Sequence, residues 1–407
     1  MKKFVIVSII LLGIGIGAFS FSLYHFISAE KEKTATPDEP LVSTEAQNET
    51  QEKEESDKRE SLLSDDGIFS ANYEKAAAYV ENMTAEQMAG QMIVGINSGD
   101  DAFKNNFSQY NLGGCLFKNE SLDYKSQDEV KKMLSEYKSG AKTPAILAAQ
   151  EEGGNVTTVS GHDAFADYVF DSPRNLYESG GLEAAENAET KKAELLSSLG
   201  FNMNLAPVVD MAEEFNQIMY SRSLCADKST VSQYARFVIE TMQSNGVSAT
   251  LKHFPGYGTI PDTTDDVVVD TRDLSIIESV DMAPFESGIK AGAHFVMTSN
   301  VVVEKIDSKH TASLSPDMHK ILRDKLNFTG LIITDEIDKQ DYSAYADNRS
   351  VYVSAVLAGN DMILARDYIS AYNDILKGVK DETIPMDTLK TACTRILAYK
   401  YTAKIIQ

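Results

Sequence analysis

The chain from residue 68 to residue 407 predicts an α/β fold, and a (β/α)8 barrel of the TIM type is the favoured architecture. Short apolar runs alternate with amphipathic stretches along this part of the chain, which is the order expected of strands joined by helical crossovers. There are eight such runs, the number of strands in a TIM-type barrel. The candidate strands are residues 91–96, 113–117, 144–149, 202–209, 248–254, 294–300, 330–336 and 361–365.

The helices between these strands are predicted from the spacing of their apolar residues. Residues 188–200, 229–246 and 315–327 place apolar side chains three or four positions apart, as an amphipathic helix does. Gly200 and Gly246 stand where two of these helices end before the next strand. A doubly wound open sheet is the alternative fold. It is weakened because neither GxGxxG nor a GxxxxGK motif follows the first strand.

Residues 1–29 predict either a transmembrane signal-anchor or a cleaved signal peptide. Lys2 and Lys3 precede an apolar stretch that is longer than the roughly 20 residues needed to span a bilayer. The tripeptide Ile-Ser-Ala before Glu30 would also serve as a cleavage site. An anchor would leave the lysines in the cytoplasm and give a cell-membrane protein with a single N-terminal span. A cleaved signal would give a secreted protein, and both alternatives place the rest of the chain outside the cell.

Residues 30–67 predict a disordered acidic linker, because they hold many charges and few large apolar side chains. The whole chain carries a formal net charge of −23, which argues against a nucleic-acid partner. Its three cysteines are widely spaced, and no HExxH or paired-cysteine motif is present. We therefore expect no disulfide framework, no metal and no cofactor.

Polar and charged residues follow five of the candidate strands at the point where each strand ends. The carboxyl ends of the strands of a TIM-type barrel meet at one rim, where the active sites of such barrels lie. These residues are therefore predicted to line one pocket. The set comprises Gln150 to Glu152 after the third strand, Asp210 and Arg222 after the fourth, Lys252 and His253 at the fifth, Thr298 to Asn300 at the sixth, and Thr334 to Glu336 at the seventh.

Several of these residues belong to recognisable motifs. The most specific are LKHFPGYG at residues 251–258 and ASLSP at residues 312–316, followed by LIITDE at residues 331–336. EEGG, NLAPVVD and RSL accompany them in the third-strand and fourth-strand regions. Together these stretches resemble the N-terminal domain of glycoside hydrolase family 3, and in particular its single-barrel β-N-acetylhexosaminidase branch. The resemblance extends from about Ala71 to Lys404.

The resemblance implies a retaining glycosidase that hydrolyses terminal β-linked N-acetylglucosamine. In such enzymes a carboxylate attacks the anomeric carbon, and water then hydrolyses the glycosyl-enzyme intermediate. Asp335 matches the nucleophile of the family. Lys252, His253 and Arg222 match residues that bind sugar hydroxyls through charge-assisted hydrogen bonds. The implied partner is a carbohydrate that contains N-acetylglucosamine, such as peptidoglycan or a related cell-wall glycan.

Four positions depart from the family pattern. The family carries an Asp-x-His pair after KHFPGxG, and its histidine is the general acid/base; here Asp262 matches the aspartate, but Thr264 occupies the histidine position. A threonine cannot protonate a leaving group near neutral pH. The strand-three aspartate of the family is Gln150 here, a following arginine is Thr158, and a strand-six histidine is Asn300. Gln150, Thr264 and Asn300 are nevertheless predicted to line the sugar-binding site.

Three interpretations follow. In the first, the protein is a hexosaminidase in which Asp262, Asp265 or Asp266 replaces the histidine, since a carboxylic acid with a raised pKa can donate the proton. In the second, it is a catalytically weak or inactive barrel that binds glycan at the cell surface. In the third, it hydrolyses a different sugar, because the replaced aspartate and arginine have changed the specificity.

Overall fold

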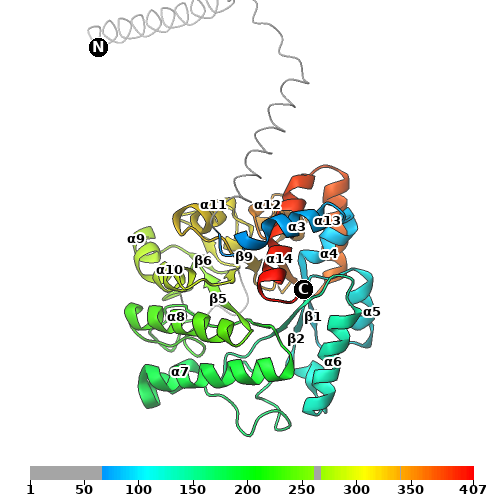
Figure 1. The fold of residues 1–407 in the computed structure, drawn as a ribbon. Coiled ribbons are helices and arrows are strands. Elements are labelled where there is room, and N and C mark those ends of the chain that lie inside the picture. Colours follow the sequence, from blue (N-terminus) through cyan, green and yellow to red (C-terminus); the bar gives the residue numbers. More distant parts are fainter. Residues whose placement is uncertain (1–66, 261–266, 340) are drawn as a thin grey trace, which may run out of the picture. The chain divides into compact units, whose positions relative to one another are not determined.

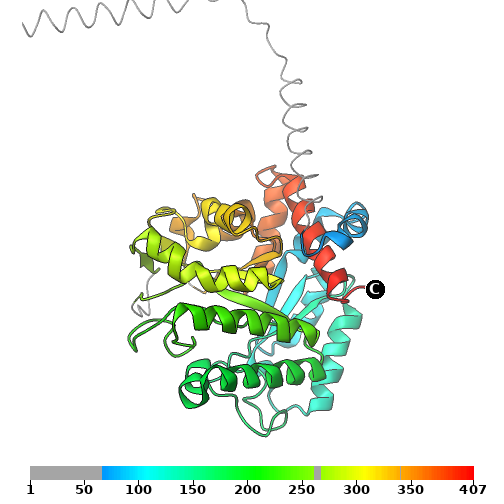
Figure 2. The ribbon, with the colours of Figure 1, turned by 60° about the vertical axis from the view of Figure 1, so that its left-hand side comes forward.

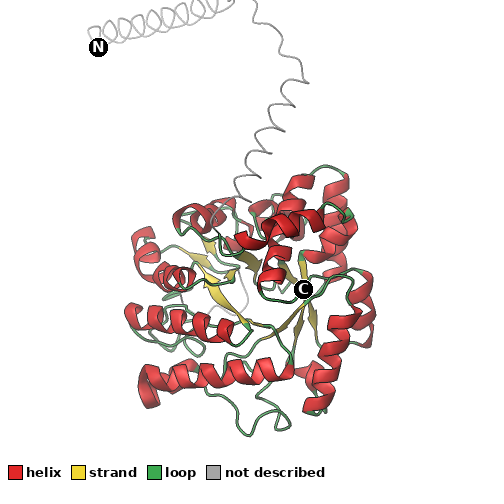
Figure 3. Cartoon of the chain, viewed as in Figure 1, coloured by secondary structure: helices red, strands yellow, loops and turns green. Residues whose placement is uncertain are grey.

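A computed structural model describes residues 67–260, 267–339 and 341–407, and it shows a barrel of parallel strands enclosed by helices (Figures 1 and 3). The barrel strands are β1 (Ile93–Asn97), β2 (Gly114–Phe117), β3 (Ile146–Ala149), β4 (Met203–Asn204), β5 (Ser248–Phe254), β7 (Phe295–Thr298), β9 (Leu331–Thr334) and β10 (Ile363–Ala365). All eight predicted strands are thus confirmed. Neighbours pair in parallel in the order β10-β1-β2-β3-β4-β5-β7-β9.

The barrel is nearly closed where β9 approaches β10. A parallel bridge joins Ile333 to Met362, the residue before β10. The backbone N–H of Thr334 donates to the carbonyl of Met362 (3.2 Å), and the N–H of Ile337 donates to the carbonyl of Leu364 (3.2 Å). The predicted TIM-type barrel is therefore confirmed, and the alternative of an open doubly wound sheet is wrong.

Helices cover the outside of the barrel, and Figures 1 and 2 show α7, α8 and α10 packed side by side. The helices are α3 (Tyr73–Val80), α4 (Ala85–Gln91), α5 (Asp101–Gln109), α6 (Gln127–Gly140), α7 (Pro173–Leu199), α8 (Lys228–Ser244), α9 (Leu274–Ile276), α10 (Met282–Lys290), α11 (Pro316–Lys320), α12 (Val351–Ala358), α13 (Tyr368–Lys380) and α14 (Met386–Thr402). Short 3-10 or π turns are η1 (Ser70–Asn72), η2 (Asn119–Leu122), η3 (Ile277–Asp281), η4 (Ala312–Leu314), η5 (Ile321–Lys325) and η6 (Ser343–Tyr345).

The predicted helices are present, and their ends follow the sequence signals. α8 begins after Asp227, whose carboxylate accepts from the backbone N–H groups of Ser229 (2.9 Å) and Thr230 (3.2 Å) and so caps the helix. α7 ends at Gly200, which adopts a left-handed conformation (φ 102°) that glycine reaches without steric cost. α7 begins at Pro173, well before the predicted start, and its backbone leaves the helical conformation at Gly180 and Gly181.

Two short strands lie outside the barrel sheet. β6 (Val269–Asp270) pairs in parallel with β8 (Val302–Val303), and these strands follow β5 and β7 in the chain. This small sheet extends the carboxyl end of the barrel and places Asp270 beside the loops of the candidate site. A two-residue strand carries no periodic signal, which is why the sequence did not predict it.

Part of the predicted organisation lies outside the described residues. This applies to the signal-anchor or signal peptide at residues 1–29 and to the linker at residues 30–67 except for its last residue. In the part of the chain that the structure describes, no helix is both long and apolar enough to cross a bilayer. The domain boundaries therefore stay predictions.

Candidate active site

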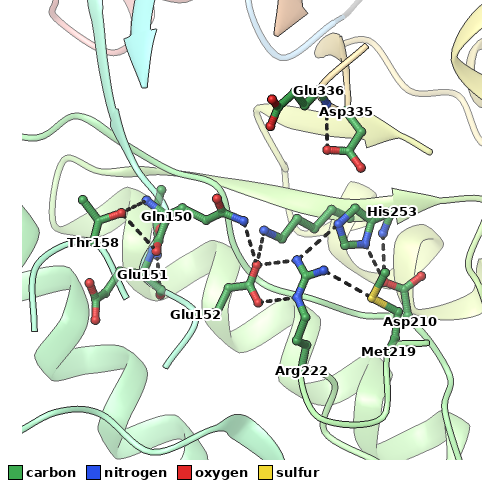
Figure 4. Close-up of polar contacts among 12 residues, drawn as sticks. Gln150, Glu151, Glu152, Thr158, Asp210, Met219, Arg222, His253, Asp335 and Glu336 are labelled. Atoms are coloured by element: carbon green, nitrogen blue, oxygen red, sulfur yellow. Dashed lines mark hydrogen bonds and ion pairs between the residues drawn. The ribbon is translucent and has the colours of Figure 1, made fainter. Parts of the chain in front are cut away.

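Glu152 follows β3 and lies at the centre of a charged group at the carboxyl ends of the strands (Figure 4). Its side chain is buried, with 2% exposure of the residue. Its Oε1 accepts from Arg222 Nη2 (2.7 Å), from Gln150 Nε2 (3.1 Å) and from Lys252 Nζ, and its Oε2 accepts from Arg222 Nε (2.9 Å). A buried carboxylate is tolerated only when it is paired in this way.

The charged residues of this group determine one another's pKa values. Burial would raise the pKa of Glu152, but Lys252 and Arg222 lower it well below its ordinary value. Burial lowers the pKa of Lys252, and Glu152 opposes that effect. The pKa of Arg222 is raised, because Glu152 outweighs the effect of burial. Glu152 therefore stays ionised and positions the two cations; it cannot serve as a proton donor.

Side chains of α7 and α8 hold the backbone of Glu152 in place. Its carbonyl oxygen accepts from Lys192 Nζ (2.6 Å), a fully buried ammonium that also donates to Glu189 Oε1 (2.7 Å). The Tyr234 hydroxyl donates to the same Glu189 oxygen (2.7 Å). These bonds connect the two helices to the strand-end loop, so the position of the Glu152 carboxylate is set by the barrel scaffold.

His253 is oriented by Asp210, at the end of the fourth-strand region. Asp210 Oδ2 lies 2.8 Å from His253 Nδ1 and also accepts from the His253 backbone N–H (3.1 Å). Asp210 Oδ1 accepts from the backbone N–H of Tyr257 (2.8 Å), whose ring packs edge-on against the imidazole (centroids 5.6 Å apart). The other ring nitrogen, Nε2, lies 3.5 Å from Arg222 Nη2. The imidazole is thus fixed with Nε2 toward the charged group.

Asp335 directly follows β9 and faces this group from the opposite side (Figure 4). Its backbone N–H donates to the carbonyl of Thr298 (2.9 Å), and its Oδ1 accepts from the backbone N–H of Glu336 (2.8 Å). Burial would raise the pKa of Asp335, but His253, that backbone N–H, Lys252 and Arg222 lower it below its ordinary value. Asp335 is therefore an ionised carboxylate, partly exposed, whose Oδ2 has no hydrogen-bond partner among the described residues.

The neighbours of Asp335 shape its surroundings. Burial and the Asp335 charge raise the pKa of Tyr342 to about 12, so this phenol stays protonated beside the carboxylate. The Glu336 carboxylate points to another side in Figure 4 and is held by Arg366, with Oε1 at 3.0 Å from Nε and 2.8 Å from Nη2. Glu336 is therefore bound away from Asp335.

Gln150 lies beside Glu152, and Thr158 and Asn300 are mostly engaged within the protein. Thr158 Oγ1 lies 2.9 Å from the Gln150 backbone nitrogen and 3.2 Å from its carbonyl oxygen, so this buried threonine fixes the loop. Asn300 Nδ2 donates to the Glu336 carbonyl (3.1 Å), and its Oδ1 accepts from Ser313 Oγ (2.6 Å). Asn300 thus supports the backbone next to Asp335.

Asp262, Thr264 and Asp265 lie outside the described residues, so their predicted roles stay predictions. The two ends of that loop are well anchored. The Ile218 N–H donates to the Ile260 carbonyl (3.2 Å). On the other side, Arg272 donates to both oxygens of Asp270 (Nε to Oδ1 2.9 Å, Nη2 to Oδ2 2.7 Å) and pairs with Asp281 (2.8 Å). The loop therefore starts and ends at the rim that carries Asp335.

Two residues of this site have a larger role than the sequence indicated. Glu152 was seen only as part of a motif, and Asp210 only as a strand-end residue. The signal for both was the same: an acidic residue directly after a buried apolar strand needs a cation or several N–H donors nearby. Within the described ranges, no group of three or more His, Cys, Asp or Glu side chains is arranged to hold a metal ion.

Such a barrel, with an ionised aspartate and fixed cations at the carboxyl ends of its strands, has the construction of a TIM-barrel enzyme. A model of the Glycosyl hydrolase family 3 N terminal domain matches residues 84–399. The chain therefore belongs to glycosyl hydrolase family 3.

Relatives and solved structures agree with this assignment. The beta-hexosaminidase of Xanthomonas campestris pv. campestris (strain B100) is 32% identical over 231 residues, covering 55% of this chain and 68% of that protein. The beta-hexosaminidase of Xylella fastidiosa (strain M12) is 33% identical over 236 residues, covering 55% and 67%. The family 3 beta-N-acetylglucosaminidase from Paenibacillus sp. str. FPU-7 superposes with a TM-score of 0.73 at 25% identity, covering 79% of this chain and 63% of that chain, which is less than two thirds of its length. The Beta-N-acetylhexosaminidase from Beutenbergia cavernae has the same fold (TM-score 0.68, 24% identity, 79% and 99% covered).

Proposed function

We propose that this protein is a retaining glycoside hydrolase that removes terminal β-linked N-acetylhexosamine from glycans, with Asp335 as the nucleophile. The observation that carries the proposal is the state of the Asp335 carboxylate. One oxygen is fixed by a backbone N–H at 2.8 Å, the other has no partner among the described residues, and the surrounding cations keep the group ionised. An anionic, partly exposed oxygen held at a strand end is what nucleophilic attack on an anomeric carbon requires.

The other charged residues suit the binding of the sugar. Lys252 and Arg222 present N–H donors on the side of the site that faces Asp335, and Glu152 holds them in place, while Asp210 orients the His253 ring beside them. Preorganised donors of this kind bind sugar hydroxyls and stabilise charge that develops near the ring. The names of the relatives, beta-hexosaminidase and beta-N-acetylglucosaminidase, support the choice of an N-acetylhexosamine.

The proton donor is assigned to the loop after β5. Thr264 stands at the position of the family histidine and has no proton to give near neutral pH. We assign the general acid/base to Asp262 or Asp265 in the same loop, whose ends are anchored at the rim of the site. Glu336 is a weaker candidate, because Arg366 holds its carboxylate as an ion pair.

A surface location fits this substrate class. Residues 1–29 would hold the protein in the cell membrane, or would direct its secretion if they are cleaved, and the glycan would be peptidoglycan or another cell-wall polymer. The support is the sequence pattern alone. Fractionation of cells, followed by mass determination of the mature chain, distinguishes an anchored protein from a secreted one.

The first prediction tests the nucleophile. The full chain, purified in detergent, should release 4-nitrophenol from its N-acetyl-β-glucosaminide, and Asp335→Asn should lower kcat/KM by roughly a thousandfold or more. This leaving group needs little protonation, so an absent acid does not hide a working nucleophile. NMR of the first product formed from a β-linked substrate should show the β anomer, as a retaining mechanism requires.

The matched control is Asp317→Asn, which changes an exposed aspartate of α11 that pairs with Lys320 (3.0 Å). It should keep full activity, and both variants should show the melting temperature of a folded protein. Equal turnover by Asp335→Asn and the unchanged protein would contradict the mechanism. Absence of turnover on every nitrophenyl sugar, combined with measurable glycan binding, would instead support an inactive glycan-binding barrel, the alternative that Thr264 favours.

A further inference from the structure

Lys118 is a cation of the site that the mechanism leaves unused. It directly follows β2, is partly exposed, and its ammonium lies 3.4 Å from Gln150 Oε1. Among the described residues no carboxylate lies within ion-pair distance of Lys118, although the site is rich in acids. An ammonium with only a neutral amide as partner keeps two N–H donors and its full charge for a ligand.

The charges near Lys118 do not balance. Arg222 and Lys252 share the single carboxylate of Glu152, and the Gln150 amide nitrogen donates to that same carboxylate at 3.1 Å. This end of the site therefore holds three cations and the Glu152 carboxylate, while the neighbouring Glu151 carboxylate is bound by the backbone N–H groups of Val159 (2.7 Å) and Ser160 (3.3 Å). Asp335, the other nearby carboxylate of the mechanism, lies at the far end of the group drawn in Figure 4, away from Gln150. A position with excess positive charge, partly shielded from water, attracts an anion.

Gln150 adds specificity to this position. Its amide is oriented by its two contacts, with the nitrogen toward Glu152 and the oxygen toward Lys118. A carboxylate at residue 150 would form an ion pair with Lys118 and neutralise it. The neutral amide instead orients the ammonium and leaves its charge available. The amide nitrogen has a second N–H group, which can donate to a ligand beside Lys118.

We propose that Lys118 and Gln150 form a binding site for a carboxylate carried by the sugar that is bound against Asp335. The preferred terminal sugar is therefore an acidic N-acetylhexosamine, with its carboxylate either at C6 or on a 3-O-lactyl ether. This inference rests on the proposed function, since it places the cleaved sugar of that reaction in this site. Lys118 is a specificity-determining residue of the proposed reaction and takes no part in its proton transfers.

The test measures binding, so that it does not depend on turnover. Titration calorimetry with the full chain compares two matched pairs: the C6 carboxylic acid of methyl N-acetyl-β-glucosaminide with methyl N-acetyl-β-glucosaminide, and the 3-O-lactyl ether of N-acetylglucosamine with N-acetylglucosamine itself. The acidic member of one pair should bind about tenfold more tightly, the range of a hydrogen bond to a charged group. The pair that shows the preference identifies the source of the carboxylate. The preference should weaken at high ionic strength, since the site is partly exposed.

Three variants separate charge from structure. Lys118→Met keeps the length of the side chain without its charge and should abolish the preference. Lys118→Arg keeps the charge and should retain it. Lys131→Met, an exposed lysine of α6, should change neither binding nor preference. Melting temperatures show that each variant is folded.

Equal binding of acidic and neutral sugars, or a preference that survives in Lys118→Met, overturns this inference. If neutral sugars bind and the nitrophenyl substrate is hydrolysed, the proposed function stands while this inference falls. If no sugar binds and no substrate is hydrolysed, both fall together.

Discussion

Two buried clusters of this barrel have the same composition, one carboxylate between two cations, but they lie at opposite ends of the strands. The carboxyl-end cluster consists of Glu152, Arg222 and Lys252. The amino-end cluster consists of Asp361, Arg323 and Arg395, where the strands β9 and β10 begin. Their difference lies in what the cations do with their remaining N–H groups.

In the amino-end cluster, Arg323 binds backbone carbonyls as well as the carboxylate. Arg323 Nη2 donates to Asp361 (2.7 Å), and Arg323 Nη1 donates to the backbone carbonyls of Phe328 and Gly330 (both 2.7 Å). Arg395 donates to the other Asp361 oxygen (2.5 Å). Such a cluster joins the strand β9 to the chain before it and after it, and this is a structural role.

The carboxyl-end cluster keeps hydrogen-bonding capacity. The nearest acceptor of Arg222 Nη1 is the sulfur of Met219 at 3.6 Å, which is a weak partner. Lys252 Nζ donates to Glu152 and has further N–H groups, and Asp335 across the site has an oxygen without a partner among the described residues. A buried ion cluster thus marks a functional site when its donors lie opposite an open carboxylate, and a structural one when its donors bind backbone carbonyls of neighbouring segments.

The prediction with the largest expected effect concerns the contribution of the amino-end cluster to the free energy of unfolding. Asp361→Ala leaves Arg323 and Arg395 without their carboxylate and the Ile332 N–H without its acceptor (2.8 Å). We expect a loss of about 3–5 kcal/mol in the free energy of unfolding, because two buried cations are left uncompensated. Urea unfolding followed by circular dichroism measures it. Activity per folded molecule should be unchanged.

The control for that variant is Asp317→Ala, which removes an exposed pair with Lys320. It should change the free energy of unfolding by less than about 1 kcal/mol. A similar loss in both variants would mean that the amino-end cluster contributes no more than a surface ion pair.

The second prediction concerns Glu152→Gln at the carboxyl end. Glutamine keeps the shape and one acceptor, and Arg222 is partly exposed, so we expect a loss of about 1–3 kcal/mol in the free energy of unfolding. Activity should fall roughly a hundredfold, because the two cations lose the group that positions them. Glu152→Gln should therefore lower activity more than stability, whereas Asp361→Ala should lower stability and leave the activity per folded molecule unchanged. Glu136→Gln, which removes an exposed pair with Lys104, is the control and should change neither quantity measurably.

Comparison with the sequence shows which parts of this design could be predicted. All eight strands were found, because each is a short apolar run bounded by helical sequence. The rim residues Asp335, Lys252 and His253 were found, because the carboxyl ends of parallel strands must meet. These predictions depend on local pattern and topology alone.

What could not be predicted depends on side-chain direction. Glu151 and Glu152 are adjacent and chemically identical, yet Glu151 accepts from the backbone N–H groups of Val159 (2.7 Å) and Ser160 (3.3 Å), and only Glu152 reaches the cations. The sequence cannot say which of two neighbouring acids faces the site, because the turn after β3 decides it. Asn300 likewise sits at the predicted rim, but its amide supports the backbone next to Asp335.

The last prediction concerns a lysine at the barrel's amino end that has no carboxylate partner among the described residues. Lys400 in α14 is fully buried, and its Nζ donates to Gln91 Oε1 (2.6 Å), a neutral partner. Burial lowers the pKa of Lys400 to about 7. Lys252 is equally buried, but Glu152 opposes the downward shift of its pKa. The two lysines therefore differ in whether a negative charge compensates for burial.

The sign of the pH dependence follows from this shift. Between about pH 7 and the ordinary lysine pKa of 10.5, the unfolded chain holds a proton on Lys400 that the folded chain has released. The unfolded state thus binds more protons, so the free energy of unfolding should rise with pH in this window, by up to about 1.4 kcal/mol per pH unit. Below pH 7 both states are protonated and this contribution is flat.

Other groups titrate in the same range, so the measured quantity is the slope of the unchanged protein minus that of Lys400→Met. Lys390 lies on the same helix as Lys400 and pairs with Glu81 (3.0 Å). Lys390→Met removes that pair and should leave the slope unchanged. If Lys400→Met also left it unchanged, Lys400 would be charged in the folded protein, and a neutral amide would suffice to hold a buried ammonium in this barrel.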